Sequence, residues 1–453
     1  MSKHLILAGL LVAGMLPGSA LAQAKHSGEW KVRQEWVRAH ESFLASPVLQ
    51  GRGSATRDEA IAAAYVAAQF ESFGLQHAPG MESYLQTAKI IKLRADGALL
   101  TAGGAAVADP QLLMGSARPV AGKLVVFDGK DPAAMPAGEV VLATGDASVM
   151  QLYRAASAKK AKLLIVRAGE ESAKLLGAFG GKPRMPTWLD GTPVPERLSI
   201  VALPAASFDA LAGKAGADVS LTLLGLVQDV ATTTNAIGWL PGRDPKAGVI
   251  LYTAHLDHLG LRPDGVMMPG ANDDASGTTA VLELARALAA GKKMRRGILF
   301  VAYGSEEIGG FGSTWFGMHP PVPLSDIAAN IEFEMIGAQD PKFKNGDLMM
   351  TGYERSNLGE ALRAHGALLM ADPYPEQNFF RRSDNYSLAL KGVVAHTISG
   401  WAVTPTYHSP EDSFANLDIP FMTRAIQSLI GPARWLADSD FTPEWKPGGR
   451  PEE

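Results

Sequence analysis

Cysteine is absent from all 453 positions of the chain. Disulfide bonds are therefore excluded, and so is the kind of lipid anchor that is attached to a cysteine where a leader is cleaved. A metal site in this chain must be built from histidine, aspartate and glutamate side chains.

The chain also has little net charge and no basic segment with interleaved aromatic residues. Its formal net charge is −4, and aromatic residues make up 7% of it. We therefore expect no nucleic acid partner, because such recognition relies on clustered lysine and arginine. Apolar residues make up 47% of the chain, which excludes wholesale disorder and predicts about two or three domains with a sizeable core.

A long apolar run occurs only near the start of the chain. Lys3 precedes an apolar segment at residues 5–16, and the sequence Ala-Leu-Ala follows at residues 20–22. This order is typical of a secretory signal peptide, so we expect residues 1–22 to be removed and the protein to be exported, as a periplasmic or secreted protein. A buried N-terminal helix is the alternative. The run is short for a membrane span and no later segment is long enough, so we expect no membrane anchor.

The middle of the chain differs in character from the rest. Residues 101–227 hold short apolar runs separated by proline and glycine, and none of the ten histidines. We predict a strand-rich α+β domain there, inserted between the two parts of an α/β domain at 23–100 and 228–438. In that domain continuous apolar strands alternate with helices, which is typical of a sheet buried on both faces. The polar, proline- and glycine-rich residues 439–453 are predicted to be a flexible tail.

Acids and histidines stand directly after the predicted strands of the α/β domain. In such sheets, active sites gather where the strands end. Helix capping or a solvated loop explains any one of these motifs alone. Together, two histidines and three carboxylates in loops of one domain fit a pair of zinc ions that share a carboxylate, and they also suit cobalt or manganese. The set consists of His255, Asp273, Glu307, Glu334 and His408.

Neighbours of these residues suit supporting roles. Asp257 lies two positions after His255, so in an extended chain it points to the same side and can hydrogen-bond the second ring nitrogen. Glu306 stands beside Glu307 and can take a proton from a metal-activated water.

The order of the motifs resembles the secreted di-zinc aminopeptidase family, whose relatives include glutamate carboxypeptidase, the transferrin receptor ectodomain and the glutaminyl cyclases. The resemblance rests on TAHLDHLG, GANDDASG, GSEEIGGFGS, NIEFEMIG, FRRSDNYS and YHSPEDSFANL, in that order, and spans nearly the whole mature chain. It implies a mixed central sheet flanked by helices, two zinc ions and a peptide substrate that is cleaved from its amino end. The strand-rich segment is similar to the protease-associated domain that many members carry.

The resemblance also implies a role for each residue of the site. The ligands would be divided between two zinc ions, with His255 and Glu334 on one, Glu307 and His408 on the other, and Asp273 as the bridge. Glu306 would be the general base, and Tyr407 would hydrogen-bond the oxyanion. Asp257 would orient His255, and the peptide bond between Asp273 and Asp274 would be cis.

Two departures from the family pattern stand out. The family usually has aspartate in place of Glu334, and the longer glutamate keeps the same charge, so metal binding is expected to survive. Glu332 nearby is a competing candidate ligand. The family's Ser-Asp-His motif is Ser-Asp-Asn at residues 383–385, which affects a pocket or a supporting contact rather than the metals.

Other residues allow two interpretations. Arg381, Arg382 and Asp384 are candidate substrate-binding residues. The two arginines suit a carboxylate clamp, and solvated side chains are the alternative. His258 is predicted to support the ligands or to lie in the loop, and His396 to be a packed core histidine.

The function therefore has open alternatives beside the metallo-aminopeptidase. A carboxypeptidase or dipeptidase would use the same metal centre, and a glutaminyl cyclase would bind a single zinc ion. A non-catalytic receptor-like binding protein is disfavoured because the full ligand set and Glu306 are present. The sequence leaves the oligomeric state open.

Overall fold

Two large β-sheets contain most of the strands in the computed structural model, which describes residues 30–178 and 180–452. The predicted signal peptide at 1–22 lies outside the described residues. From Val32 onward the chain forms one compact unit by its internal contacts. Among the described residues, no helix has the length and apolar character that crossing a bilayer requires.

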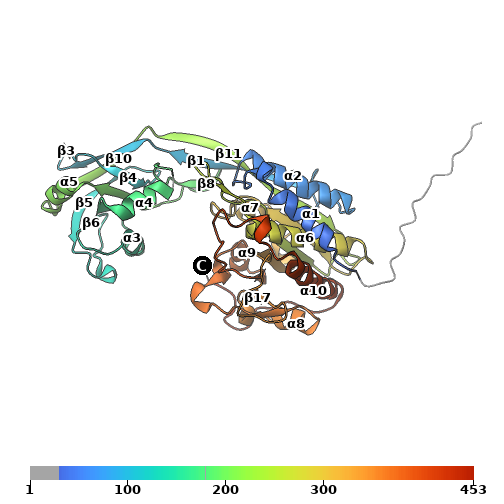
Figure 1. The fold of residues 1–453 in the computed structure, drawn as a ribbon. Coiled ribbons are helices and arrows are strands. Elements are labelled where there is room, and N and C mark those ends of the chain that lie inside the picture. Colours follow the sequence, from blue (N-terminus) through green and yellow to red (C-terminus); the bar gives the residue numbers. More distant parts are fainter. Residues whose placement is uncertain (1–29, 179, 453) are drawn as a thin grey trace, which may run out of the picture. The chain divides into compact units, whose positions relative to one another are not determined.

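The first sheet has nine strands and is mixed, as the sequence predicts (Figure 1). Its central strands β16, β12 and β15 are parallel neighbours, and β11, β1 and β8 extend it in antiparallel pairs. Every residue of β12 and β15 is buried, as expected for a sheet covered on both faces. In spatial order the strands are β18 (Leu369–Ala371), β17 (Leu348–Met350), β19 (Ala395–Ser399), β16 (Ile327–Glu334), β12 (Val249–His255), β15 (Gly297–Tyr303), β11 (Val227–Leu240), β1 (Leu85–Arg94) and β8 (Thr187–Leu189).

Helices cover both faces of this sheet (Figure 1). Helices α1, α2, α6 and α10 pack together on one face, with α6 directly on β12 and β16. On the other face, Phe316 of α7 and Leu388 of α9 join an apolar cluster with Leu251 and Leu299 of the sheet. The helices are α1 (Gln34–Leu44), α2 (Arg57–Ser72), α6 (Gly277–Ala289), α7 (Phe311–Met318), α8 (Leu358–Ala364), α9 (Asn385–Leu390) and α10 (Ile419–Asp438).

The second sheet has eight strands between residues 97 and 224. Strands β5, β6, β7 and β9 form its parallel centre. Leu152 of α3 packs on one face and Phe208 of α5 on the other. In spatial order the strands are β3 (Ala105–Ala106), β2 (Gly97–Ala102), β10 (Asp218–Leu224), β5 (Val120–Phe127), β6 (Val140–Ala143), β7 (Leu163–Arg167), β9 (Ser199–Leu203) and β4 (Gln111–Met114), and the helices are α3 (Val149–Ala158), α4 (Glu170–Ala178) and α5 (Ala205–Ala212).

This second sheet overlaps the predicted insert domain, with two differences. The predicted boundary at residue 101 falls inside β2, and β8 leaves the segment to pair with β1 of the first sheet. Apolar runs and turn residues indicate where strands lie, but they do not say which sheet a short strand joins. The division into domains itself stays a prediction.

The segment after α10 is packed rather than loose. Trp445 Nε1 donates a hydrogen bond to the carbonyl of Gly392 (3.1 Å), and Arg355 Nη1 donates to the carbonyl of Gly449 (3.1 Å). The Trp445 ring also meets the ring of Phe380 edge-on, at 6.3 Å between centroids. The prediction of a flexible tail is therefore wrong for residues 439–452, because proline and glycine content does not reveal a single anchoring aromatic side chain.

Candidate metal centre and active site

The predicted ligands lie along one edge of the nine-stranded sheet. His255 is the last residue of β12, Glu334 is the last residue of β16, and Glu307 follows β15. These strands are parallel neighbours, so their carboxyl ends meet at the same edge. Asp273 comes from the turn η3 (Ala271–Ser276) before α6, and His408 from the loop after β19. Five separate segments thus converge on one place.

The converging side chains form two groups of candidate metal ligands that share Asp273. The groups are His255 with Asp273 and Glu334, and His258 with Asp273 and Glu307. His408 adjoins the second group, since its Nε2 lies 3.2 Å from Oδ2 of Asp273 and 3.2 Å from Oε2 of Glu307. The structure therefore brings all five predicted ligands together and adds His258, which the sequence placed only nearby.

The facing atoms of this centre lack ordinary hydrogen-bond partners. Nε2 of His255 and Nε2 of His408 are buried and have no such partner among the described residues, although each lies 3.2 Å from an oxygen of Asp273. Two atoms bound to the same tetrahedral zinc ion at about 2.0–2.1 Å lie about 3.3 Å apart. Both the spacing and the unpaired atoms fit metal ions placed between these side chains.

The electrostatics of the centre also fit cations. Burial, reinforced by neighbouring carboxylates, raises the pKa of Asp274 and of Glu306 well above the usual range, against the opposing effect of His255. Burial acts the same way on Asp273, but its contacts with His255 and His408 outweigh it and hold the pKa of Asp273 low. An excess of desolvated acids is stabilised by bound divalent ions.

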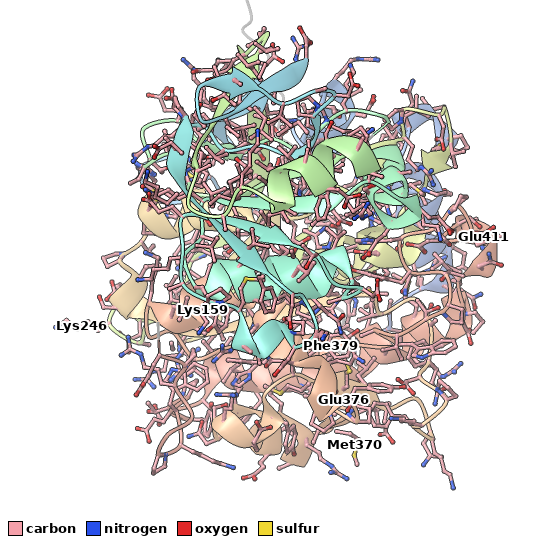
Figure 2. The ribbon with its side chains drawn as sticks, turned by 90° about the vertical axis from the view of Figure 1, so that its left-hand side faces the viewer. Lys159, Lys246, Met370, Glu376, Phe379 and Glu411 are labelled. Atoms are coloured by element: carbon pink, nitrogen blue, oxygen red, sulfur yellow. The ribbon has the colours of Figure 1, made fainter. Side chains whose placement is uncertain are left out.

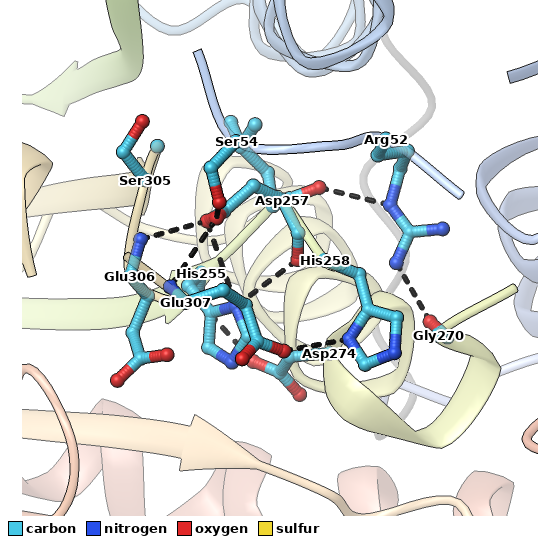
Figure 3. Close-up of polar contacts among 12 residues, drawn as sticks. Arg52, Ser54, His255, Asp257, His258, Gly270, Asp274, Ser305, Glu306 and Glu307 are labelled. Carbon is cyan, nitrogen blue, oxygen red and sulfur yellow. Dashed lines mark hydrogen bonds and ion pairs between the residues drawn. The ribbon is translucent and has the colours of Figure 1, made fainter. Parts of the chain in front are cut away.

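Asp257 supports the centre in a different way from the predicted one. Nδ1 of His255 donates to the backbone carbonyl of Asp257 (3.2 Å), while the Asp257 carboxylate lies 3.7 Å from that nitrogen. The carboxylate instead accepts from Ser54 Oγ (2.5 Å) and from the backbone N–H of Glu306 (3.0 Å; Figure 3). The Asp257 carboxylate therefore fixes the loop that carries Glu306 and Glu307, and the Asp257 backbone carbonyl fixes the His255 ring.

Asp274 joins the ends of three elements. Its carboxylate accepts from the backbone N–H groups of His255 (3.3 Å), Gly277 (2.9 Å) and Met335 (3.0 Å), which belong to β12, α6 and the residue after β16. The peptide bond between Asp273 and Asp274 is cis, as the resemblance implies. Asp274 thus holds together the ends of β12 and β16, the two strands that carry the candidate ligands His255 and Glu334.

Asp412 holds the turn that carries Asp273. Its two oxygens accept from the backbone N–H groups of Asn272 (2.8 Å) and Asp273 (3.0 Å). Asp412 is 2% exposed and follows His408 in the same loop. The sequence alone did not single it out, because an acid in a polar loop also occurs without a partner.

Arg52 is a fully buried clamp that the sequence did not reveal. Its guanidinium donates to the backbone carbonyls of Leu44 (2.6 Å), Leu256 (2.9 Å), Pro269 (2.8 Å) and Gly270 (2.6 Å; Figure 3). The carbonyl of Leu256 directly follows His255, and those of Pro269 and Gly270 precede Asp273, so the clamp ties together two segments that carry candidate ligands. The carbonyl of Leu44 ends α1. The only sequence signal is an arginine flanked by glycines at 51–53.

A small pocket with a cavity volume of about 30 Å³ opens beside the first group. Its wall contains the carboxylate of Glu334, apolar side chains of Met335, Met349 and Phe379, and, at 37% exposure, Tyr407. Figure 2 labels Phe379 on the face turned to the viewer. Polar groups of Thr351, Thr397 and Ser399 also line it. The pocket therefore places Glu334, a candidate metal ligand, next to a partly apolar wall.

The three candidate substrate-binding residues lie in different places relative to this pocket. Arg382 lines it, with its guanidinium 4.9 Å from the centre of the Phe379 ring. Arg381 instead lies over the Tyr386 ring at 5.5 Å. Asp384 is 3% exposed and accepts from Ser313 Oγ (2.5 Å). Of the three candidates, only Arg382 lines this pocket.

The competing candidates near the site have other partners. Glu332 accepts from the backbone N–H of Asn385 (2.5 Å) and from Thr397 Oγ1 (3.2 Å), and it is in neither ligand group. His396 is buried, and its ring nitrogens contact Ser356 Oγ and the carbonyl of Thr351, which confirms it as a core histidine.

Comparison with solved structures identifies the class of fold. An aminopeptidase from Aneurinibacillus sp. strain AM-1 superposes with a TM-score of 0.58 over 93% of this chain and 96% of that chain, at 21% identity. A zinc aminopeptidase from Bacillus subtilis gives a TM-score of 0.57 over 91% of this chain and 97% of that one, at 22% identity. The fold is therefore that of zinc aminopeptidases.

Comparison of sequences gives a family match over part of the chain. Residues 235–430 match the model of Peptidase family M28, which confirms the resemblance to zinc aminopeptidases over this part of the chain. Leupeptin-inactivating enzyme 1 of Streptomyces exfoliatus is 30% identical over 47% of this chain and 51% of its own length. Aminopeptidase YwaD of Bacillus subtilis is 29% identical over 41% of this chain and 41% of its own. The chain thus matches about half or less of these relatives.

Proposed function

We propose that the protein is an exported, zinc-dependent aminopeptidase with two zinc ions. One ion would be held by His255, Asp273 and Glu334, and the other by Asp273, Glu307 and His408. The observation that carries the proposal is the sharing of Asp273 between two groups of candidate ligands at one sheet edge, in which Nε2 of His255 and Oε1 of Glu307 have no hydrogen-bond partner among the described residues. When bound, the ions would polarise the scissile carbonyl and acidify the attacking water.

Glu306 is the proposed general base. It is in neither ligand group, and its backbone N–H is held by Asp257. Its carboxylate is therefore available to take a proton from the attacking water and to pass it to the leaving amine. Near the cations, the carboxylate would be ionised, since opposite charge lowers the pKa of an acid.

Tyr407 is proposed to hydrogen-bond the oxygen that becomes negative as the tetrahedral intermediate forms. Burial, together with Asp273, Glu307 and Glu334, raises the pKa of the Tyr407 hydroxyl above its usual range. The hydroxyl therefore keeps its proton and can donate it as a hydrogen bond. Its ring stacks on that of His408 at 3.8 Å, which holds the side chain beside the second group.

The pocket beside Glu334 suits the amino-terminal residue of a peptide. A free ammonium group would meet the carboxylate of Glu334, and the side chain would enter the chamber lined by Met335, Met349 and Phe379. Arg382 forms no ion pair with any described carboxylate, so its guanidinium is available to a substrate carboxylate. We therefore expect acidic as well as apolar amino-terminal side chains to be accepted.

The eight-stranded segment and the leader complete the proposal. We propose that residues 101–227 act as a protease-associated domain that shapes access to the substrate, and that residues 1–22 direct export. Sequencing the amino terminus of the protein from the medium or the periplasm tests the second point. A chain that begins near Gln23 supports export, and an intact leader in the cytoplasm contradicts it.

The direction of cleavage is tested with matched peptides. Purified protein is given a short peptide with a free amino end and the same peptide acetylated at that end, and the released amino acids are measured. The proposal predicts stepwise release from the free amino end and none from the acetylated peptide. Equal cleavage of both peptides would contradict an aminopeptidase, and release from the carboxyl end would indicate a carboxypeptidase.

A further inference from the structure

We propose that His258 is a positioning residue of the second metal group, where it holds one oxygen of Glu307 so that the other oxygen faces the metal. The proposal rests on the zinc centre proposed above. It goes beyond the ligand set implied by the family resemblance, which leaves His258 without a defined role.

His258 is fully buried against the ligand-bearing loops. Its side chain is 0% exposed, and Nδ1 lies 2.7 Å from Oε1 of Glu307 (Figure 3). Its backbone N–H donates to the carbonyl of Arg52 (3.0 Å). A Cβ atom at Gly270, whose φ is +61°, would come within 2.4 Å of Cγ of His258. The ring is thus confined between the Arg52 clamp and the turn that leads to Asp273.

The distances distinguish a positioning role from a ligand role. Oε2 of Glu307 is 3.2 Å from Nε2 of His408, close to the roughly 3.3 Å expected for two atoms on one zinc ion. Oε1 is only 2.7 Å from Nδ1 of His258, well short of that spacing, and neither atom has a hydrogen-bond partner elsewhere among the described residues. One carboxylate oxygen of Glu307 therefore faces His258, and the other faces His408 and is left for the metal.

Glu307 needs such a partner because its loop holds it weakly. The backbone N–H of Glu307 lies 3.4 Å from Oδ2 of Asp257, whereas that of Glu306 lies 3.0 Å from Oδ1. A side chain left to rotate would lose part of its affinity for the ion, and removing such supporting contacts commonly weakens metal binding by about 10- to 100-fold.

The test measures zinc affinity rather than catalysis. Metal-free full-length protein is titrated with zinc in competition with a chromophoric chelator, for the wild type and for His258→Leu, His258→Asn and His396→Leu. Asparagine can present an N–H donor where Nδ1 stands. His396 is the matched control, because it is also a fully buried histidine but lies outside both ligand groups.

We expect His258→Leu to weaken one of the two zinc-binding steps by about 10- to 100-fold and to leave the other within about threefold. His258→Asn should recover most of the lost affinity, and His396→Leu should leave both steps unchanged. If the leucine variant fails to fold, His258→Ala takes its place and is judged against His258→Asn.

Two results would overturn the proposal. Unchanged zinc binding in His258→Leu would show that the contact has no role in the centre. Complete loss of one ion in both His258→Leu and His258→Asn, equal to the loss in His408→Ala, would make His258 a direct ligand. Binding of fewer than two ions by the wild type is a separate outcome, which contradicts the proposed centre itself.

Discussion

The two sheets of this chain bury very different side chains. In the described residues 97–224, the buried polar side chains are those of Ser116, Ser172 and Ser199, and the rest of the interior is apolar. Beneath and beside the nine-stranded sheet, the buried set includes acids, histidines and a whole arginine guanidinium. Buried charges are costly unless each has a partner. The first sheet therefore stabilises a chemical site as well as a core, and the second packs only a core.

The largest effect is expected at Glu306, the proposed general base beside the first sheet, which has no counterpart in the second sheet. Glu306→Gln removes the proposed proton acceptor and keeps the size of the side chain. Hydrolysis should fall by about 10²- to 10⁴-fold, while zinc content stays that of the wild type. Peptide release and elemental analysis on the same sample check this. Full activity in the variant would remove Glu306 from the mechanism.

A matched pair of leucines compares the two sheets directly. Leu251 in β12 and Leu142 in β6 are both 0% exposed. Truncation of either to alanine should lower the free energy of unfolding of its own region by about 2–5 kcal/mol. Only Leu251→Ala should also weaken zinc binding, because β12 ends in His255.

Urea unfolding and zinc titration on both leucine variants give the result. If zinc binding weakens equally in both variants, the second sheet also supports the centre. The claim that only the first sheet supports it would then be wrong.

Glu41 offers a pH test of the buried charges on the first sheet. Burial raises its pKa from 4.5 to about 8, against the lowering effects of Thr279 and Arg52. The folded protein therefore holds a proton on Glu41 that the unfolded chain releases above about pH 4.5. This contribution to stability is complete below pH 4.5 and is lost as pH rises through about 8.

Glu41→Gln should therefore remove part of the decline in unfolding free energy between pH 5 and pH 8, on the order of 2 kcal/mol. Urea unfolding at both pH values checks this. An identical decline in the wild type and the variant would mean that Glu41 is ionised in the folded state.

The smallest effect is expected at the mouth of the pocket. Arg382→Ala should lower kcat/KM for a substrate with amino-terminal glutamate by about tenfold, or about 1.4 kcal/mol, relative to one with amino-terminal leucine. Arg381→Ala is the control, because Arg381 lies over Tyr386 and does not line the pocket. Equal changes in the two variants would show a general charge effect instead of a contact.

Much of the fold and the ligand set could be predicted from the sequence. Continuous apolar strands such as β12 and β15 indicated a buried sheet, and histidines or acids at strand ends are rare enough to be informative in combination. The same reasoning brought His255, Asp273, Glu307, Glu334 and His408 to one place, as the structure does.

The supporting contacts could not be predicted in the same way. Arg52, Asp412 and Asp274 act through backbone groups far away in the chain, and a backbone carbonyl or N–H leaves no mark on the residue type. Asp257 shows the same limit, since its backbone carbonyl contacts the His255 ring where spacing suggested its carboxylate. The prediction of a flexible tail failed for a related reason, because Trp445 anchors an otherwise polar segment.

The central claim is that one carboxylate, Asp273, joins two zinc sites at the edge of the first sheet. Elemental analysis of purified wild type and Asp273→Asn, after equilibration with the same free zinc concentration, tests it most directly. We expect about two zinc ions per wild-type chain and loss of both in the variant. Loss of a single ion, or two ions retained, would contradict a shared ligand, and a wild type without zinc would contradict the metal centre.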